Sequence, residues 1–273
     1  MAENGHGPDF IEAISRGLEV LRSFSPAQPQ MSLSEVAQAT NLARPTARRI
    51  LLTLEELGYV RISHGSHSLT PRVLELGMAY VGSLGLWDMA RPHLEDLAEQ
   101  TNEPCSMAQL DGADIVYVAQ VVVPKLIALR VDIGTRFPAL LTSQGKVLLA
   151  ALEPDEALEA LTVPSRSGLP FNSQGREEIL AALSEVRSQG WAVADQLLVG
   201  GIRSVSVPVS DGSGKVKACI NVTVNAAETS MDTLLDVYLP LLQVAAEKTH
   251  QDWARWQARP SSNSKVAKSA ARA

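Results

Sequence analysis

The stretch MSLSEVAQATNLARPTARRILLTLEELGYVRISHGSHSL, residues 31–69, decides the fold of the N-terminal part of the chain. A first helix is predicted over about Leu33–Ala39, because Ser32 is a good side-chain cap and apolar residues recur at helical spacing. After a short turn, a second helix begins near Pro45, a residue that a first helical turn tolerates. Gly58 fits the left-handed position that ends a helix.

The second helix is predicted to have a buried face and a basic face. Two strands follow it, Tyr59–Ile62 and His67–Leu69, joined by His64-Gly65-Ser66. A solvated helix face would also explain the arginines, but the order of cap, helix, turn, basic helix, glycine and hairpin favours a winged helix-turn-helix. The second helix of such a motif enters the major groove of DNA. The inward stripe is predicted to be Ala47, Ile50, Leu51, Leu54 and Leu57. The residues predicted to contact DNA are Arg44, Pro45, Thr46, Arg48, Arg49, Arg61 and His64.

Length and composition are those of a two-domain globular protein: 273 residues, 45% of them hydrophobic and 20% charged. The net charge of −6 does not exclude DNA binding, because phosphate contacts depend on local clusters of Lys and Arg. Cys105 and Cys219 are too few for a disulfide scaffold, and we expect both in a core or pocket of a cytoplasmic protein. No secretion signal and no membrane span are expected.

Residues 1–8 are expected to be disordered, and a helix over about Asp9–Phe24 is expected to pack behind the helix-turn-helix. A long linker helix is predicted over residues 71–100, kinked or restarted at Pro92 with Asp88 as a cap. Operators commonly consist of two half-sites read by a two-fold dimer, so this helix is the expected dimer interface.

From residue 103 onward the apolar pattern has a period of two, interrupted by helical segments, which predicts an α+β domain with an antiparallel sheet. Asp111-Gly112-Ala113-Asp114 is a good hairpin turn. The predicted strands are Cys105–Leu110, Ile115–Val123, Leu126–Val131, Ala192–Val193, Ile202–Val209 and Val216–Val224. The predicted helices begin near Ser143 or cover residues 154–162, 176–189 and 231–256. The tail has no pattern and is expected to be disordered.

Several quoted segments resemble the IclR family of bacterial transcription regulators. They are SRGLEVLRSF, LSEVAQATNLARPTARRILLTLEELGYV and LTPRVLELG in the first half, and GTRFPALLTSQGKVLLAAL, GWAVAD and GGIRSVSVPVSDGSGKVKACINVTV in the second. The TARR helix and the SLGLW linker are similar to the branch that regulates protocatechuate and β-ketoadipate catabolism. The resemblance implies a DNA-binding domain (1–70), a linker for dimerisation (71–100), a GAF-like effector-binding domain (101–257) and a tail (258–273).

The resemblance also implies an effector pocket at the N-terminus of the helix that opens at Ser143. Backbone N–H groups and the helix dipole favour a carboxylate there. The implied pocket residues are Ser143, Gln144, Gly145, Asp195, Ile202, Ser204, Asn221 and Thr223. Arg130 and Arg136 are expected either to neutralise a dianionic ligand or to form structural ion pairs. The family usually has Glu after the residue that matches Asp195, where this chain has Gln196-Leu197.

An enzyme is the main alternative. Gly145-Lys146 suggests a phosphate-binding loop, but Leu140 stands where Gly is needed and Val147 where Ser or Thr would bind magnesium. The five histidines show no metal-ligand spacing. We therefore expect no catalytic residues, no metal and no cofactor.

The resulting hypothesis is a ligand-responsive, homo-oligomeric transcription factor, a dimer or a tetramer, that binds a double-stranded DNA operator. Its effector is expected to be a small carboxylate, an aromatic acid or its ring-cleavage product, and RNA polymerase would be a partner if the protein is an activator. Two alternatives remain: a sensor that acts through protein contacts only, and a regulator of unrelated carboxylate metabolism.

Overall fold

The computed structural model describes residues 7–125, 131–169 and 175–258. The chain divides into two compact units, Met1–Ser83 and Leu84–Ala273. The predictions for residues 1–6, for the strand residues 126–130 and for the tail from residue 259 lie outside the described part. In the described part, no helix is long and apolar enough to cross a membrane.

The N-terminal unit contains a helix-turn-helix with a small sheet. Its α2 helix begins with a capping box, in which the Ser32 hydroxyl accepts from the Glu35 N–H and the Glu35 carboxylate accepts from the Ser32 N–H. Gly58 has φ of +80° directly after the second helix, as predicted. The elements are α1 (Glu12–Ser23), β1 (Gln30–Ser32), α2 (Leu33–Ala39), α3 (Arg44–Glu56), β2 (Val60–Ser63), β3 (Ser66–Leu69), a 3₁₀ turn (Pro71–Val73) and α4 (Leu74–Leu84).

The predicted inward stripe of α3 is only partly correct. Ala47, Leu51 and Leu54 are buried and Ile50 is half-buried, but Leu57 is 51% exposed. Leu57 is the C-cap residue after Glu56, so it lies at the end of the helix, where its side chain stays in solvent. The core of this unit is completed from other elements, by Val20 and Phe24 at the end of α1, Met31 in β1, Val36 in α2 and Val60 in β2.

The wing is a three-stranded antiparallel sheet in the order β1-β3-β2, in which β1 was not predicted. Ser63 pairs with Ser66, so the connection is the two residues His64-Gly65. Both have positive φ, 52° and 79°, which matches the twist of the flanking strands.

The expected single linker helix is two helices. The chain breaks at Gly85, which has φ of +59°, and α5 (Leu86–Thr101) then runs through Pro92 without ending. The restart predicted at Pro92, with Asp88 as cap, is therefore wrong. A Cβ at Gly85 would lie 2.6 Å from the Trp256 ring, so only glycine fits this break.

The C-terminal unit is built on an antiparallel sheet in the order β6-β5-β4-β9-β8-β7. The predicted hairpin at residues 111–114 joins β4 and β5, the first two strands of this sheet along the chain. The strands are β4 (Cys105–Asp111), β5 (Asp114–Val121), β6 (Arg136–Pro138), β7 (Ala192–Asp195), β8 (Ile202–Ser210) and β9 (Val216–Asn225). The helices are α5, a 3₁₀ turn (Ala139–Leu141), α6 (Ser143–Ala150), α7 (Pro154–Thr162), α8 (Arg176–Gln189), a π-helical segment (Thr233–Tyr238) and α9 (Leu239–Gln257).

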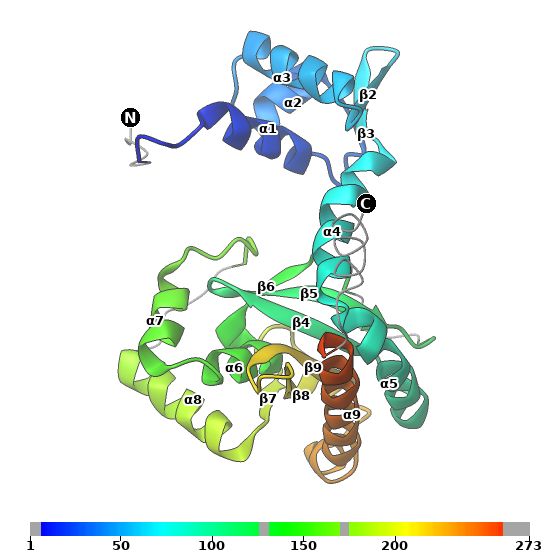
Figure 1. The fold of residues 1–273 in the computed structure, drawn as a ribbon, viewed down its shortest axis with the longest axis vertical. Helices are drawn as coiled ribbons and strands as arrows, with labels where there is room; N and C mark the ends of the chain where they lie inside the picture. Colours follow the sequence, from blue (N-terminus) through cyan, green and yellow to red (C-terminus); the bar gives the residue numbers. More distant parts are fainter. Residues whose placement is uncertain (1–6, 126–130, 170–174, 259–273) are drawn as a thin grey trace, which may run out of the picture. The chain divides into compact units, whose positions relative to one another are not determined.

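Helices cover both faces of this sheet: α5 and α9 on one, and α6 to α8 on the other (Figure 1). Because successive side chains of a strand point to opposite faces, alternate residues of each strand belong to different faces of the sheet. On β8, Val205 and Val207 belong to the core beneath α5 and α9, whereas Ser204 and Ser206 contact α6. Ser204 and Ser206 are therefore presented to the N-terminus of α6.

Candidate functional site

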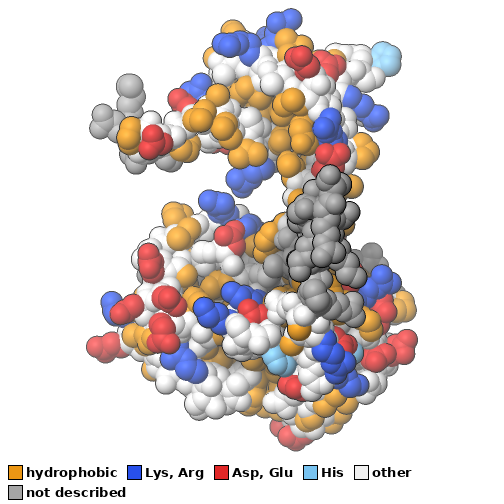
Figure 2. Space-filling model, viewed as in Figure 1, with side chains coloured by type: hydrophobic (Ala, Val, Ile, Leu, Met, Phe, Trp, Pro, Cys, Tyr) orange, Lys and Arg blue, Asp and Glu red, His pale blue; other side chains and the backbone are white. Residues whose placement is uncertain are grey.

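The basic face of α3 is open to solvent. Arg44, Arg48 and Arg49 are exposed, and within the described residues none of the three has an ion-pair partner. Figure 2 shows Lys and Arg side chains (blue) over α3 and over the β2–β3 hairpin of this unit. Ala43 gives the helix no side-chain cap, which leaves N–H groups at its N-terminus for a phosphate, and Pro45 is exposed beside them.

The wing exposes Arg61 and His64, whereas its second histidine, His67, is buried. Arg61 is exposed and its Nε–H donates to the Ser68 hydroxyl at 3.2 Å. His64 is exposed at the hairpin loop. His67 is buried, with its Nδ1 at 3.2 Å from the Met31 carbonyl, and therefore fixes β1 to the sheet.

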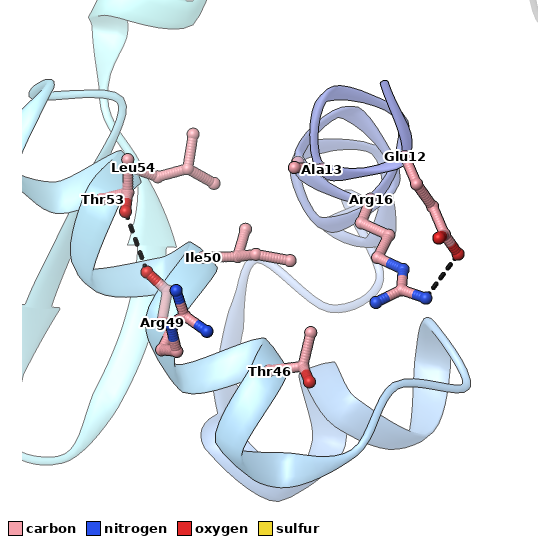
Figure 3. A pocket seen from close by; sticks show the side chains of 9 residues that line it. Glu12, Ala13, Arg16, Thr46, Arg49, Ile50, Thr53 and Leu54 are labelled. Carbon is pink, nitrogen blue, oxygen red and sulfur yellow. Dashed lines mark hydrogen bonds and ion pairs between the residues drawn. The ribbon is translucent and has the colours of Figure 1, made fainter. Parts of the chain in front are cut away.

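A groove between α1 and α3 adjoins the predicted DNA-binding residues (Figure 3). Thr46 and Arg49 line it from α3, and Arg16 lines it from α1, where it pairs with Glu12. The Thr53 hydroxyl donates to the Arg49 carbonyl at 3.0 Å within α3. Packing of α1 thus adds a further arginine beside the basic helix, which sequence spacing alone did not reveal.

A second polar constellation lies at the N-terminus of α6. The Ser143 hydroxyl forms hydrogen bonds of 2.7 Å with the hydroxyls of Ser204 and Ser206 on β8. The Thr142 hydroxyl accepts from the Gly145 N–H at 3.0 Å. The amide of Gly145 is therefore already used as part of the helix cap, which leaves the earlier amides of the helix for a ligand.

The start of α6 borders a small cavity of about 30 Å³. Four predicted pocket residues line this cavity: Gln144, Ile202, Ser204 and Thr223. Among the described residues, no charged side chain lines it. The remaining lining residues are Tyr117, Leu141, Thr142, Ala194, Leu197, Leu198 and Val199.

Gln144 has the most unusual environment in the cavity. It is 1% exposed, and neither Nε2 nor Oε1 has a hydrogen-bond partner among the described residues. Buried side-chain amides normally have partners, so this one indicates a site that a ligand completes. Burial also raises the pKa of the Tyr117 hydroxyl, which keeps that group neutral.

The structure does not bring every predicted residue to the cavity wall. Asp195 pairs with Arg203 at 2.8 Å, and the hydrogen bond from Arg203 lowers the pKa of its carboxyl. Asn221 is buried behind the wall, where it accepts from Ser106 at 2.6 Å and donates to Thr223 at 2.9 Å.

Of the two arginines predicted to neutralise a dianionic ligand, the structure describes one, and that one already has partners. The Arg136 guanidinium pairs with Asp111 at 2.7 Å and with Asp114 at 3.2 Å, so its charge is used within the sheet edge. Arg130 lies outside the described residues. The cavity wall itself therefore offers helix amides and neutral side chains to an anion.

Tyr117 and the segment 197–199 were not predicted to line the pocket. The sequence did draw attention to this segment, because Gln196-Leu197 stands where the family usually has an acidic residue. Gln196 has φ of 56°, and its side chain accepts from the Gly201 N–H at 3.1 Å, which folds the loop back over the cavity. Leu197 contributes an apolar side chain to the cavity wall there.

Helix α6 also carries the lysine of the phosphate-loop pattern considered above. Lys146, the lysine of the rejected phosphate-loop pattern, donates to the Val193 carbonyl at 3.1 Å, and burial lowers its pKa. Among the described residues, no group of three His, Cys, Asp or Glu side chains could hold a metal ion.

Comparison with known protein families finds a match for the N-terminal part of the chain and another for the C-terminal part. The IclR helix-turn-helix domain matches residues 13–62, and the C-terminal domain of IclR bacterial transcriptional regulators matches residues 78–251. The chain is 36% identical to the Pca regulon regulatory protein of Pseudomonas putida, covering 88% of this chain and 83% of that protein. It is 30% identical to the p-hydroxybenzoate hydroxylase transcriptional activator of Acinetobacter baylyi, over 88% and 91%.

A crystal structure of a transcriptional regulator from Rhodococcus sp. RHA1 has the same fold. Its TM-score is 0.77 at 44% identity, with 90% of this chain and 99% of that chain covered. These matches agree with the exposed basic helix of one unit and the polar cavity of the other. The chain belongs to the IclR family of bacterial transcriptional regulators, which bind DNA and are not enzymes.

Proposed function

We propose that this regulator responds to a small aromatic acid, or to a ring-cleavage product of one, which binds the cavity at the N-terminus of α6. The observation that carries the proposal is the buried, unpartnered amide of Gln144 in that cavity. Relatives named for the Pca regulon and for p-hydroxybenzoate hydroxylase support the aromatic class.

The expected ligand carries a carboxylate and an apolar body. The first amides of α6 and its dipole favour a carboxylate, while Leu141, Leu197 and Ile202 provide an apolar wall for a ring. A cavity of about 30 Å³ holds about two waters, so a ring requires the segment 197–199 to move outward. A ligand that binds only the arrangement in which this segment has moved outward would favour that arrangement of the protein.

In the N-terminal unit, we propose that α3 reads the operator in the major groove. Arg44, Arg48 and Arg49 are exposed for base edges or phosphates, and Thr46 lies in the groove beside them. Arg61 and His64 on the wing are proposed to contact the backbone or the minor groove.

We further propose a homodimer or homotetramer, because two-fold operators need paired reading helices. The support is a set of exposed apolar side chains within the N-terminal unit, on or beside helices other than α3. Its residues are Ile11, beside α1, Ile14 and Leu18 on α1, and Leu74 and Met78 on α4.

A mobility-shift titration tests the proposal. The DNA is the region upstream of the protein's own gene, with and without 3,4-dihydroxybenzoate, 4-hydroxybenzoate and β-ketoadipate. A specific shift that one acid alters would support it. A shift that none of the acids alters would refute the aromatic class and favour a regulator of unrelated carboxylates. No shift from folded protein at low salt would favour a sensor that acts through protein contacts.

A further inference from the structure

We propose that Gln144 is the residue that sets effector specificity, by selecting a ligand with two neighbouring hydroxyl groups on its ring over an acid that lacks them. This inference rests on the proposed function. Membership of the family does not determine which effector binds. We assign that selection to the Gln144 side chain.

The first step is the hydrogen-bonding need of Gln144. A side-chain amide offers two N–H donors and one carbonyl acceptor, and both Nε2 and Oε1 lack a protein partner among the described residues. Since the side chain is 1% exposed, bulk water does not reach it. A buried polar group without a partner costs about 1–3 kcal/mol, so a ligand that satisfies both atoms gains affinity.

The second step is which ligand group can satisfy both atoms. A carboxylate has acceptors only, so it could bind Nε2 but would leave Oε1 without a donor. Two neighbouring ring hydroxyls match the amide, because one donates to Oε1 while the other accepts from Nε2. The part of the wall that the structure describes holds only neutral side chains, which favours these neutral groups over a second carboxylate.

The third step is that competing polar groups on the wall already have partners. Ser204 is hydrogen-bonded to Ser143, and Thr223 accepts from Asn221. Gln144 thus presents a partnerless amide donor, Nε2, and a partnerless acceptor, Oε1, side by side on the described wall, and the neutral Tyr117 hydroxyl lies on the same wall.

The test is isothermal titration of the full-length protein with 3,4-dihydroxybenzoate and with benzoate, for wild type and Gln144→Met. Methionine keeps the length of the side chain and removes its hydrogen-bonding groups. We expect wild type to prefer the dihydroxy acid, and Gln144→Met to lose about 10- to 100-fold in affinity for it. Affinity for benzoate should change less than about threefold. Gln251→Met, on the exposed face of α9, is the matched control and should change neither.

The free protein provides a second readout. If the amide is unpaired, Gln144→Met should raise the melting temperature, because it removes a buried unsatisfied group; a structural role would lower it. Equal losses for both acids, or an unchanged preference, would overturn the assignment of Gln144 while the aromatic effector stands. Failure of wild type to bind any aromatic acid would overturn the proposed function and this inference together.

Discussion

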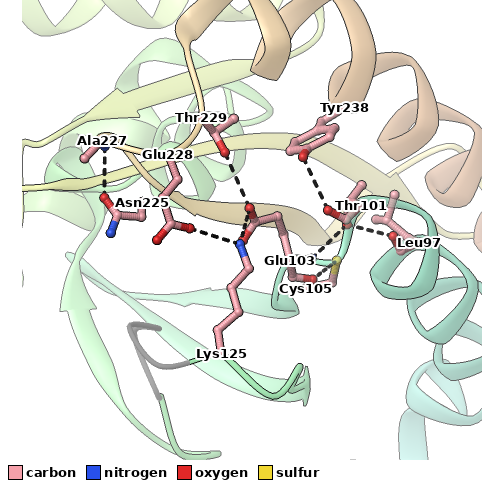
Figure 4. A network of polar contacts seen from close by, with 10 residues as sticks. All are labelled: Leu97, Thr101, Glu103, Cys105, Lys125, Asn225, Ala227, Glu228, Thr229 and Tyr238. Atoms are coloured by element: carbon pink, nitrogen blue, oxygen red, sulfur yellow. Dashed lines mark hydrogen bonds and ion pairs between the residues drawn. The ribbon is translucent and has the colours of Figure 1, made fainter.

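The ammonium of Lys125 lies 2.6 Å from a carboxylate oxygen of Glu103, in a pair of which Glu103 is 4% exposed and Lys125 18% (Figure 4). The Thr229 hydroxyl donates to the same carboxylate at 3.4 Å, and Glu228 lies 3.5 Å from Lys125. The pair joins the start of β4, the end of β5 and the turn after β9. It closes one end of the sheet with charges that have little access to water.

Removal of Lys125 should leave this buried carboxylate without its counter-ion. We expect Lys125→Met to lower the free energy of unfolding by about 3–5 kcal/mol, measured by urea denaturation. The double variant with Glu103→Gln should recover most of the loss. Arg176→Met, in the exposed pair with Asp155, should cost less than about 1 kcal/mol. Equal costs for Lys125→Met and Arg176→Met would contradict the importance of the buried pair.

The turn between β8 and β9 should make stability depend on pH. The Ser213 hydroxyl and the backbone N–H groups of Ser213 and Lys215 donate to Asp211 and lower the pKa of its carboxyl below 3.8. The unfolded chain therefore takes up this proton first as pH falls. The contribution is complete well above pH 3.8 and is lost below it.

We expect wild type to be more stable than Asp211→Asn at pH 6, with a gap that narrows as the pH falls below 3.8. Urea titrations of both proteins at a series of pH values measure it. Asp155→Asn is the control, because that carboxylate is exposed and accepts one hydrogen bond from Arg176. A gap that stays constant down to pH 3 would show that the charge of Asp211 is not what holds the turn.

The helix-turn-helix could be predicted because its signals are local. The Ser32 cap, Pro45 in the first turn of α3 and Gly58 at its end all act within a few residues. The three residues of β1 were missed because their partner strand lies more than 30 residues away in sequence. Leu57 continued the apolar spacing of α3, but spacing does not show where a helix ends.

The break between α4 and α5 and the pocket depended on long-range packing. Pro92 is the stronger local signal for a helix break, yet the chain breaks at Gly85, where Trp256 from the other end of the unit leaves no room for a side chain. Resemblance placed Gln144 and Ser204 in the pocket, but only tertiary structure brings Tyr117 and Leu197 to the same wall. It also directs Arg136 to two aspartates of the sheet edge.

Close packing at the start of α6 gives a further prediction. A Cβ at Gly145 would overlap with the backbone of Ala139, which cannot move independently of the adjoining 3₁₀ turn. We expect Gly145→Ala to destabilise the protein by about 1–3 kcal/mol and to weaken effector binding, measured by thermal unfolding and titration calorimetry. Gly77→Ala is the matched control, because its Cβ meets nothing within 4 Å in α4. That change should stabilise by about 0.5–1 kcal/mol.

The role of Arg49 can be separated into base reading and phosphate contact. The side chain is exposed on α3 and shares a groove with Thr46 and Arg16. If it contacts a guanine edge, Arg49→Ala should weaken operator binding by about 1–3 kcal/mol and relax specificity at that base pair, with little effect on random DNA. The affinities for operator, point-mutated operator and random duplex are measured by fluorescence anisotropy at fixed salt. Arg176→Ala, an exposed arginine of the other unit, is the control. An equal loss on all three duplexes would assign Arg49 to a phosphate, since backbone contacts carry no sequence information.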